Sequence, residues 1–196
     1  MARTHEGQAK TLTEQDFQAV VDYTMETSRH PERDCALLQI SYRAALRVNE
    51  IAQLTLEDIL APDGKLLNII TLRKRTTKKS KGGKAFLESP ALRSALSTYV
   101  QKRLEVDSKY RNVFLSQKGT PFTSATLSRA YTSLYKKAGA YGCTSHSGRR
   151  SAASNLIKNG ANIYQIKSVL RHENIQTTAV YLEEDDDTLA QLMRGV

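Results

Sequence analysis

The sequence predicts an α+β domain that is mainly α-helical and contains one small antiparallel sheet. Apolar residues recur at helical spacing along most of the chain, which favours helices. A short central region is rich in branched and aromatic residues on both sides of a glycine-containing loop, which is typical of two paired strands. The length of 196 residues and the hydrophobic content of 40% are those of about one globular domain.

The first third of the chain predicts three helices. One covers residues 12–25, with a capping residue at Thr13. A second begins after Pro31 and continues through residues 34–46, and a third covers residues 48–59 with almost no linker. The apolar face of the first helix is expected to consist of Phe17, Val20, Val21 and Met25.

Two strands are predicted at residues 65–72 and 84–88, because both segments are rich in residues that favour a pleated surface. The loop between them has Gly82 and Gly83 at its tip, and seven of the twelve residues from 73 to 84 are cationic. Such a loop is either a solvated surface or a contact for a phosphate backbone.

The remainder of the chain predicts five helices. The first starts at Ser89 and Pro90, and the second follows a turn at residues 117–123. The apolar stripes of these two consist of Leu92, Leu96, Tyr99 and Val100, and of Leu127, Tyr131, Leu134 and Ala138. The other three cover residues 145–160, where Gly160 closes the helix, 163–170 and 175–182.

Charge and composition indicate a polyanionic partner. The net charge is +9, and without the five acids at 183–187 the chain carries 29 basic and 15 acidic residues. No apolar run approaches the roughly 20 residues of a membrane span, and the N-terminus is too polar for a signal peptide. Cys35 and Cys143 form no CxxC pair, so neither a disulfide framework nor a zinc site is expected. These observations favour a cytoplasmic protein that binds nucleic acid.

Four short segments carry candidate functional residues. They are ALRVNEIAQLTLEDI with Arg47 and Glu50, SKGGK with Lys81, HSGRR with His146 and Arg149, and LRHENIQTTAVY with His172 and Tyr181. His146 and Arg149 are one helical turn apart, so both side chains can reach the same point. Taken singly, each segment also has an ordinary structural interpretation: a salt bridge, a solvated lysine, a hydrogen-bonded histidine or a packed tyrosine.

Together and in this order, the four segments resemble the catalytic domain of the tyrosine recombinases, the phage-integrase family, over about residues 12–181. The resemblance implies the fold of the DNA breaking-rejoining enzymes and site-specific cutting and rejoining of DNA through a 3′-phosphotyrosyl link. It implies that Arg47 and Arg149 clamp the phosphate, Glu50 supports them, Lys81 protonates the leaving group, His146 and His172 complete the clamp and transfer protons, and Tyr181 is the nucleophile.

The same resemblance implies the partners. They are double-stranded DNA, further copies of the chain in a tetrameric synapse, and possible accessory DNA-bending proteins. No cofactor is expected, and no metal either, since the chain lacks the kind of carboxylate cluster that would bind one. Residues 1–10 are expected to be a flexible tail, 11–183 the catalytic domain, and 184–196 an acidic segment and short helix exchanged between subunits. Larger family members carry a separate N-terminal DNA-clamping domain, so the chain is either a compact single-domain member or part of a longer protein.

A further set of basic residues is expected to contact the DNA backbone. It consists of Arg73, Lys74, Arg75, Lys78, Lys79, Lys84 and Arg150. The sequence does not distinguish which lysine of the loop is catalytic. Two positions depart from the family pattern: Gly148 stands where leucine is usual, and Arg171 where glycine is usual before the histidine. Neither is expected to carry chemistry.

Three alternatives remain open from the sequence. Residues 161–182 also resemble a helix-turn-helix, with 173–181 as the recognition helix of a non-catalytic regulator. A type IB topoisomerase would share the chemistry but relax supercoils. A basic helical domain without a nucleic-acid role is the third.

Overall fold

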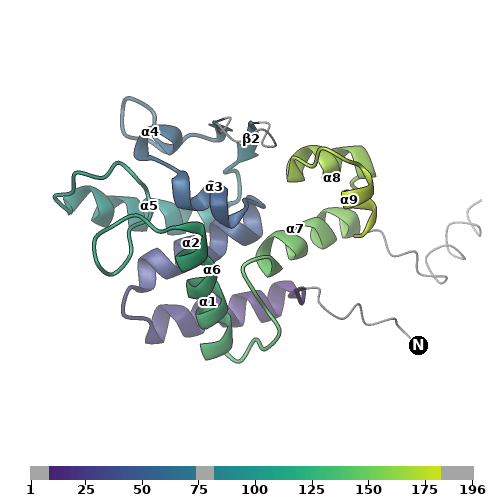
Figure 1. Ribbon diagram of the computed structural model, residues 1–196, viewed down its shortest axis with the longest axis horizontal. Helices are drawn as coiled ribbons and strands as arrows, with labels where there is room; N and C mark the ends of the chain where they lie inside the picture. The colour runs from purple at the N-terminus through teal and green to yellow at the C-terminus, as the bar shows by residue number, and fades with distance from the viewer. Residues whose placement is uncertain (1–8, 74–81, 182–196) are drawn as a thin grey trace, which may run out of the picture.

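The computed structural model describes residues 9–73 and 82–181 and shows the predicted class, mainly α-helical with one small antiparallel sheet (Figure 1). Within these residues the elements are α1 (Glu14–Thr27), α2 (Pro31–Arg43), α3 (Val48–Gln53), α4 (Leu56–Ile59), β1 (Ile69–Leu72), β2 (Gly83–Phe86), α5 (Pro90–Glu105), α6 (Ser124–Lys137), α7 (Ser147–Lys158), α8 (Ile163–Leu170) and α9 (Gln176–Ala179). No helix of the described residues has the length and apolar character needed to cross a membrane.

The first helix begins as the sequence predicts. The Thr13 side chain accepts a hydrogen bond from the Asp16 N–H at 3.1 Å and so caps α1. Its buried residues are Phe17, Val20, Val21 and Thr24. The assignment of Met25 to this face was wrong, since its side chain is 49% exposed. Thr24 takes its place because it lies seven residues, close to two helical turns, after Phe17.

The helix predicted at residues 48–59 is two short helices, α3 and α4. The break occurs because the intervening backbone pairs with a distant segment. Val113 N–H donates to the Leu54 carbonyl at 2.8 Å, and Leu56 N–H donates to the Arg111 carbonyl at 2.9 Å. These bonds occupy groups that a continuous helix would use internally. The helix predicted through residue 46 also ends earlier, at Arg43.

The two strands pair antiparallel, with Ile70 opposite Ala85 and Leu72 opposite Gly83. Ile70, Leu72 and Ala85 are buried, so one face of the hairpin packs on the body of the protein. Gly83 was predicted at the tip of the loop but belongs to β2.

Two apolar clusters fill the interior of the part of the chain that the structure describes. The main core is formed mostly by α1, α2, α5 and α6, and none of its residues lies beyond Cys143. The C-terminal core is much smaller and consists of Ala45, Ala152, Ala153, Ile166 and Leu170. Between them α7 packs closely on α2, because a Cβ added at Gly148 would lie 2.6 Å from Ser41 Oγ and 3.1 Å from the Ser41 carbonyl carbon. A leucine could not be accommodated there.

The C-terminal segment does not support a helix-turn-helix regulator. The recognition helix of that alternative was predicted at residues 173–181, but α9 covers only Gln176–Ala179. Four helical residues extend about 6 Å, which is too short to present side chains along a major groove.

Candidate active site

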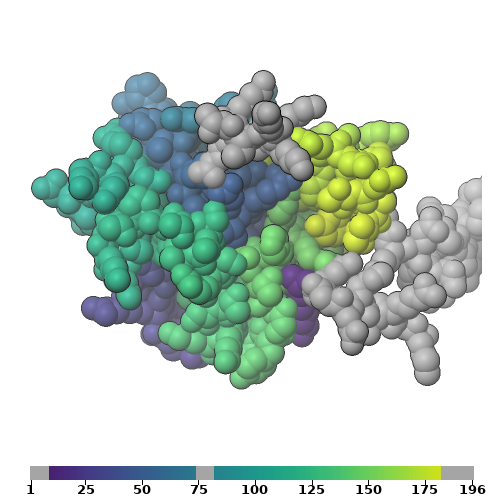
Figure 2. All heavy atoms as spheres, viewed as in Figure 1, coloured from purple at the N-terminus to yellow at the C-terminus, as the bar shows by residue number. Residues whose placement is uncertain are grey.

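A cleft of about 1050 Å³ opens where α3, α6, the start of α7 and the segment after α8 meet. In Figure 2 the surfaces of these segments, blue, green and yellow, adjoin on one face of the molecule. Five of the predicted catalytic residues line the cleft, and Arg150 lines it with them. The five are Arg47, His146, Arg149, His172 and Tyr181.

Arg47 and Glu50 are positioned by the start of α3. The Arg47 N–H donates to Glu50 Oε2 at 2.7 Å, which caps the helix, and Arg47 Nη1 donates to Glu50 Oε1 at 2.9 Å. The Arg47 side chain remains 41% exposed at the cleft. Glu50 lies behind it and lines a neighbouring pocket. This geometry fits a carboxylate that orients the arginine.

Arg149, in α7, is held more tightly than Arg47 and is only 5% exposed. Its Nη1 donates to the Ala45 carbonyl at 2.5 Å, and its Nη2 donates to the Leu170 carbonyl. Burial lowers the pKa of Arg149 to about 9, and the positive charges of Arg47 and Arg171 contribute. The guanidinium therefore stays protonated at pH 7.

The two histidines differ in environment. His146 directly precedes α7, makes no side-chain capping hydrogen bond and is exposed at the cleft. His172 is half-buried, and its Nδ1 shares a 2.9 Å hydrogen bond with the buried Thr178 hydroxyl. Burial lowers the pKa of His172 to about 4, followed by the charges of the nearby arginines, of which Arg149 has the largest effect. His172 is consequently neutral at pH 7 and able to accept a proton.

Tyr181 follows α9 and is half-buried at the edge of the cleft. Its ring stacks on His172, with centroids 6.1 Å apart and an interplanar angle of 17°. The Arg150 guanidinium lies 5.6 Å from the centre of the same ring. Arg150 was expected to contact the DNA backbone, and here it packs against the predicted nucleophile.

The remaining predicted residues lie outside this cleft or outside the described ranges. Arg73 forms an exposed ion pair with Asp58 at 3.0 Å, and Lys84 is exposed on β2. The loop residues Lys74, Arg75, Lys78, Lys79 and Lys81 fall outside the residues that the structure describes. Their roles stay predictions.

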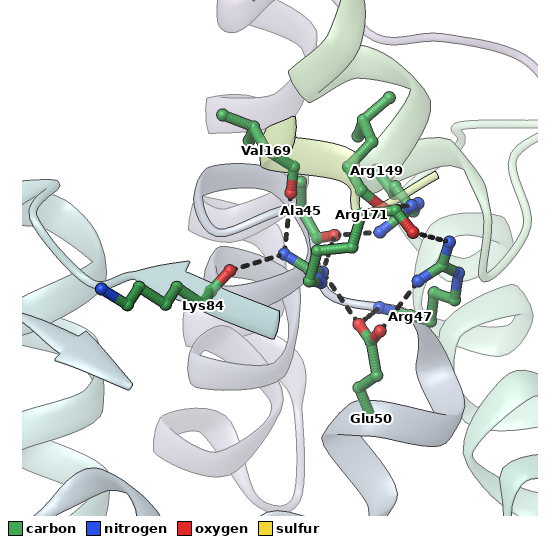
Figure 3. Close-up of polar contacts among 8 residues, drawn as sticks. Ala45, Arg47, Glu50, Lys84, Arg149, Val169 and Arg171 are labelled. Carbon is green, nitrogen blue, oxygen red and sulfur yellow. Dashed lines mark hydrogen bonds and ion pairs between the residues drawn. The ribbon is translucent and has the colours of Figure 1, made fainter. Parts of the chain in front are cut away.

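Sequence reasoning missed the part that Arg171 plays. Its Nη2 donates to Glu50 Oε2 and to the Ala45 carbonyl, each at 2.9 Å (Figure 3). Burial tends to raise the pKa of Glu50, but Arg171 and then Arg47 oppose this effect, and the net result is a lowered pKa. The departure from glycine at position 171 was the available signal, and it was assigned no chemistry.

The cleft has a strongly positive lining. Its walls include three arginines and two histidines and, in the part of the chain that the structure describes, no aspartate or glutamate. Nor do residues 9–73 and 82–181 contain a group of three His, Cys, Asp or Glu side chains arranged as metal ligands. Such a site is suited to bind an anion.

Comparisons with known proteins identify relatives of the chain. Residues 10–188 match the phage integrase family. The tyrosine recombinase XerC of Bacillus pumilus (strain SAFR-032) is 31% identical over 166 residues, which cover 81% of this chain and 52% of that protein. The chain spans about half the length of the curated relatives it matches.

Two solved structures show the same fold. The XerA recombinase aligns with a TM-score of 0.77 and 24% identity, covering 94% of this chain and 64% of its own. The Tn1549 transposon integrase, in complex with transposon right end DNA, aligns with a TM-score of 0.78 and 18% identity, covering 98% of this chain and 68% of its own.

Proposed function

Because the chain belongs to the phage integrase family, we propose that it is a site-specific DNA recombinase that cuts and rejoins strands through a covalent bond between Tyr181 and a 3′ phosphate. The observation that carries the proposal is the cleft itself. It places a tyrosine beside a neutral histidine and three arginines. A backbone phosphate of DNA would supply the negative charge that this lining lacks.

The two clamp arginines retain donors for the phosphate. A guanidinium has five N–H groups. Arg47 uses one on Nη1 for Glu50 and one on Nη2 for the Arg171 carbonyl, and Arg149 uses one on each terminal nitrogen for the Ala45 and Leu170 carbonyls. The remaining donors can bind the non-bridging oxygens, where negative charge increases as the tyrosine attacks. A donor of this kind typically contributes ~3–4 kcal/mol to the transition state.

In the cleavage step the Tyr181 oxygen bonds to phosphorus, and the bond from phosphorus to the 5′ oxygen breaks. His172 is neutral and stacked beside Tyr181, so it is placed to take the phenol proton. The bound phosphate offsets the arginine charges that lower the pKa of His172, and so favours that transfer. Lys81 is the proposed donor of the proton to the 5′ oxygen. Attack by another strand's 5′ hydroxyl reverses these steps and rejoins DNA without ATP.

The DNA contacts and assembly follow from the same proposal. The basic hairpin, including Arg73 and Lys84, would follow the backbone next to the cleft. Four copies would bring two duplexes together, aided by DNA-bending proteins. Residues 184–196 would be exchanged between copies. The Tn1549 integrase was solved with DNA, which supports a DNA partner for this fold.

Covalent trapping tests the function. A library of random-sequence duplexes, each nicked near its centre, is incubated with protein and analysed on a denaturing gel. Cleavage next to the nick releases a short fragment and traps the adduct. We expect a covalent band with wild type, located by peptide mapping at Tyr181, and none with Tyr181→Phe.

Tyr141→Phe is the matched control, because Tyr141 is 70% exposed and lies outside the cleft. It should form the adduct normally. Reversible binding without any adduct, or an adduct in Tyr181→Phe, would refute the assignment. Relaxation of supercoiled plasmid without site preference would favour a topoisomerase.

A further inference from the structure

Arg171 adopts an unusual backbone conformation at the end of α8. Its φ of 52° and ψ of 44° lie in the left-handed region, where glycine is unstrained and other residues rarely occur. The position nevertheless holds a long side chain, and only 6% of that side chain is exposed. The contacts of the guanidinium explain why an arginine is retained there.

The guanidinium joins three segments that are far apart in sequence (Figure 3). Nη2 donates to the Ala45 carbonyl and to Glu50 Oε2, both at the junction of α2 and α3. Nη1 donates to the Val169 carbonyl in α8 at 2.8 Å and to the Lys84 carbonyl in β2 at 3.4 Å. One side chain therefore ties the hairpin and α8 to the segment that carries the clamp.

Both clamp arginines depend on atoms that Arg171 holds. Its main-chain carbonyl accepts a hydrogen bond from Arg47 Nη2 at 3.1 Å. The Ala45 carbonyl, which accepts from Arg171, also accepts from Arg149. Glu50 accepts a hydrogen bond from Arg171 on Oε2 and one from the Arg47 guanidinium on Oε1. A displacement of Arg171 would thus disturb the partners of both arginines at once.

Gly83 makes room for this side chain. A Cβ added at Gly83 would lie 2.7 Å from Arg171 Cδ and 3.0 Å from Cγ, distances at which one of the two must move. Gly83 has no left-handed backbone that would itself require glycine. Position 83 therefore requires glycine because of the Arg171 side chain and not because of its own backbone conformation.

We propose that Arg171 is a positioning residue for the strand cleavage proposed above, that it fixes Arg47 and Arg149 at the phosphate site, and that Gly83 is required to admit its side chain. This inference rests on the proposed function. Arg171 acts through its neighbours, since its guanidinium is directed away from the cleft and toward the hairpin and α3.

The first test compares cleavage with binding. Arg171→Gly keeps the backbone conformation and removes every side-chain donor. We expect the rate of adduct formation at saturating trapping duplex to fall about tenfold to a hundredfold, because clamp residues displaced by a fraction of an ångström lose alignment. Affinity for uncleaved duplex should change little. Arg111→Ala is the control for loss of one positive charge, since its ion pair with Glu57 is exposed.

The second test is a double-mutant cycle. Gly83→Ala should slow adduct formation in the wild-type background, because the new methyl group displaces Arg171. In the Arg171→Gly background the same change should have no further effect, because the overlapping side chain is gone. Thermal unfolding of each variant separates loss of folding from loss of alignment. If Arg171→Gly fails to fold, Arg171→Met, which retains the stem and loses the donors, replaces it in the rate comparison.

Three results would overturn the inference while leaving the proposed function intact. One is a wild-type cleavage rate in folded Arg171→Gly or Arg171→Met. Another is an equal effect of Gly83→Ala in both backgrounds. The third is full activity of Arg171→Lys, which keeps the charge but not the forked geometry. Absence of any adduct with the wild-type chain would instead refute the proposed function.

Discussion

The main core and the C-terminal unit formed by α7, α8 and α9 are stabilised differently. The main core contains large side chains, among them Phe17 and Tyr42, whose rings stack 3.7 Å apart. Among the described residues the C-terminal core has five buried members, of which three are alanines. Burial of apolar area is therefore large in the first region and small in the second.

Directed hydrogen bonds replace apolar area in the C-terminal unit. Arg149 and Arg171 reach carbonyls and a carboxylate of the α2–α3 junction, and Asn155 donates to the Tyr42 hydroxyl at 2.9 Å. Such bonds are directional, so they fix positions as well as adding stability. The C-terminal unit, with His172 and the predicted nucleophile, is thus held by the groups that we propose align the phosphate. Single donors there should matter for catalysis, whereas single core residues should matter for stability.

A cavity in the main core should produce the largest change in stability. Phe17 is fully buried and stacked on Tyr42, so Phe17→Ala should lower the free energy of unfolding by about 3–5 kcal/mol. Adduct formation per folded molecule should stay close to wild type. Urea unfolding and single-turnover cleavage measure the two effects. A specific loss of cleavage in folded Phe17→Ala would break the distinction between the regions.

Arg149→Lys should show the opposite profile. An ammonium cannot reproduce the forked guanidinium, which donates to the Ala45 and Leu170 carbonyls and which we propose also binds a phosphate oxygen. The rate of adduct formation should fall about a hundredfold to a thousandfold. One buried carbonyl is left unpaired, so the free energy of unfolding should fall by only about 1–3 kcal/mol. A cleavage rate near that of wild type would contradict the clamp assignment.

The smallest effect concerns the pH dependence of stability. The pKa of His172 is about 4 in the folded protein, against an ordinary 6.5. Between these values the unfolded chain binds a proton that the folded chain does not, so the free energy of unfolding falls as pH falls from about 6.5 toward 4. His172→Gln should make this slope shallower, by less than the ~1.4 kcal/mol per pH unit of one full proton, since the ring is half-buried. Urea titrations across this pH range measure the slope, and an unchanged slope would exclude the shift.

Local patterns predicted the helical faces better than the helix ends. Phe17, Val20 and Val21 were assigned correctly because a 3.6-residue repeat is local. The break at Leu54 and the early start of β2 at Gly83 were missed. Pairing with residues 111–113 decides the break, and no short sequence window contains that partner.

The order of residues alone specifies which chemical groups are present and which of them lie within one helical turn, as Arg47 and Glu50 do. Backbone geometry turns such short spacings into proximity without help from the rest of the chain. Long-range packing is needed to bring Arg149 to a carbonyl 104 positions away and Arg171 to a carboxylate 121 positions away. Those contacts depend on how α7 and α8 pack against the α2–α3 junction, and the same packing buries the charges and lowers the pKa of His172.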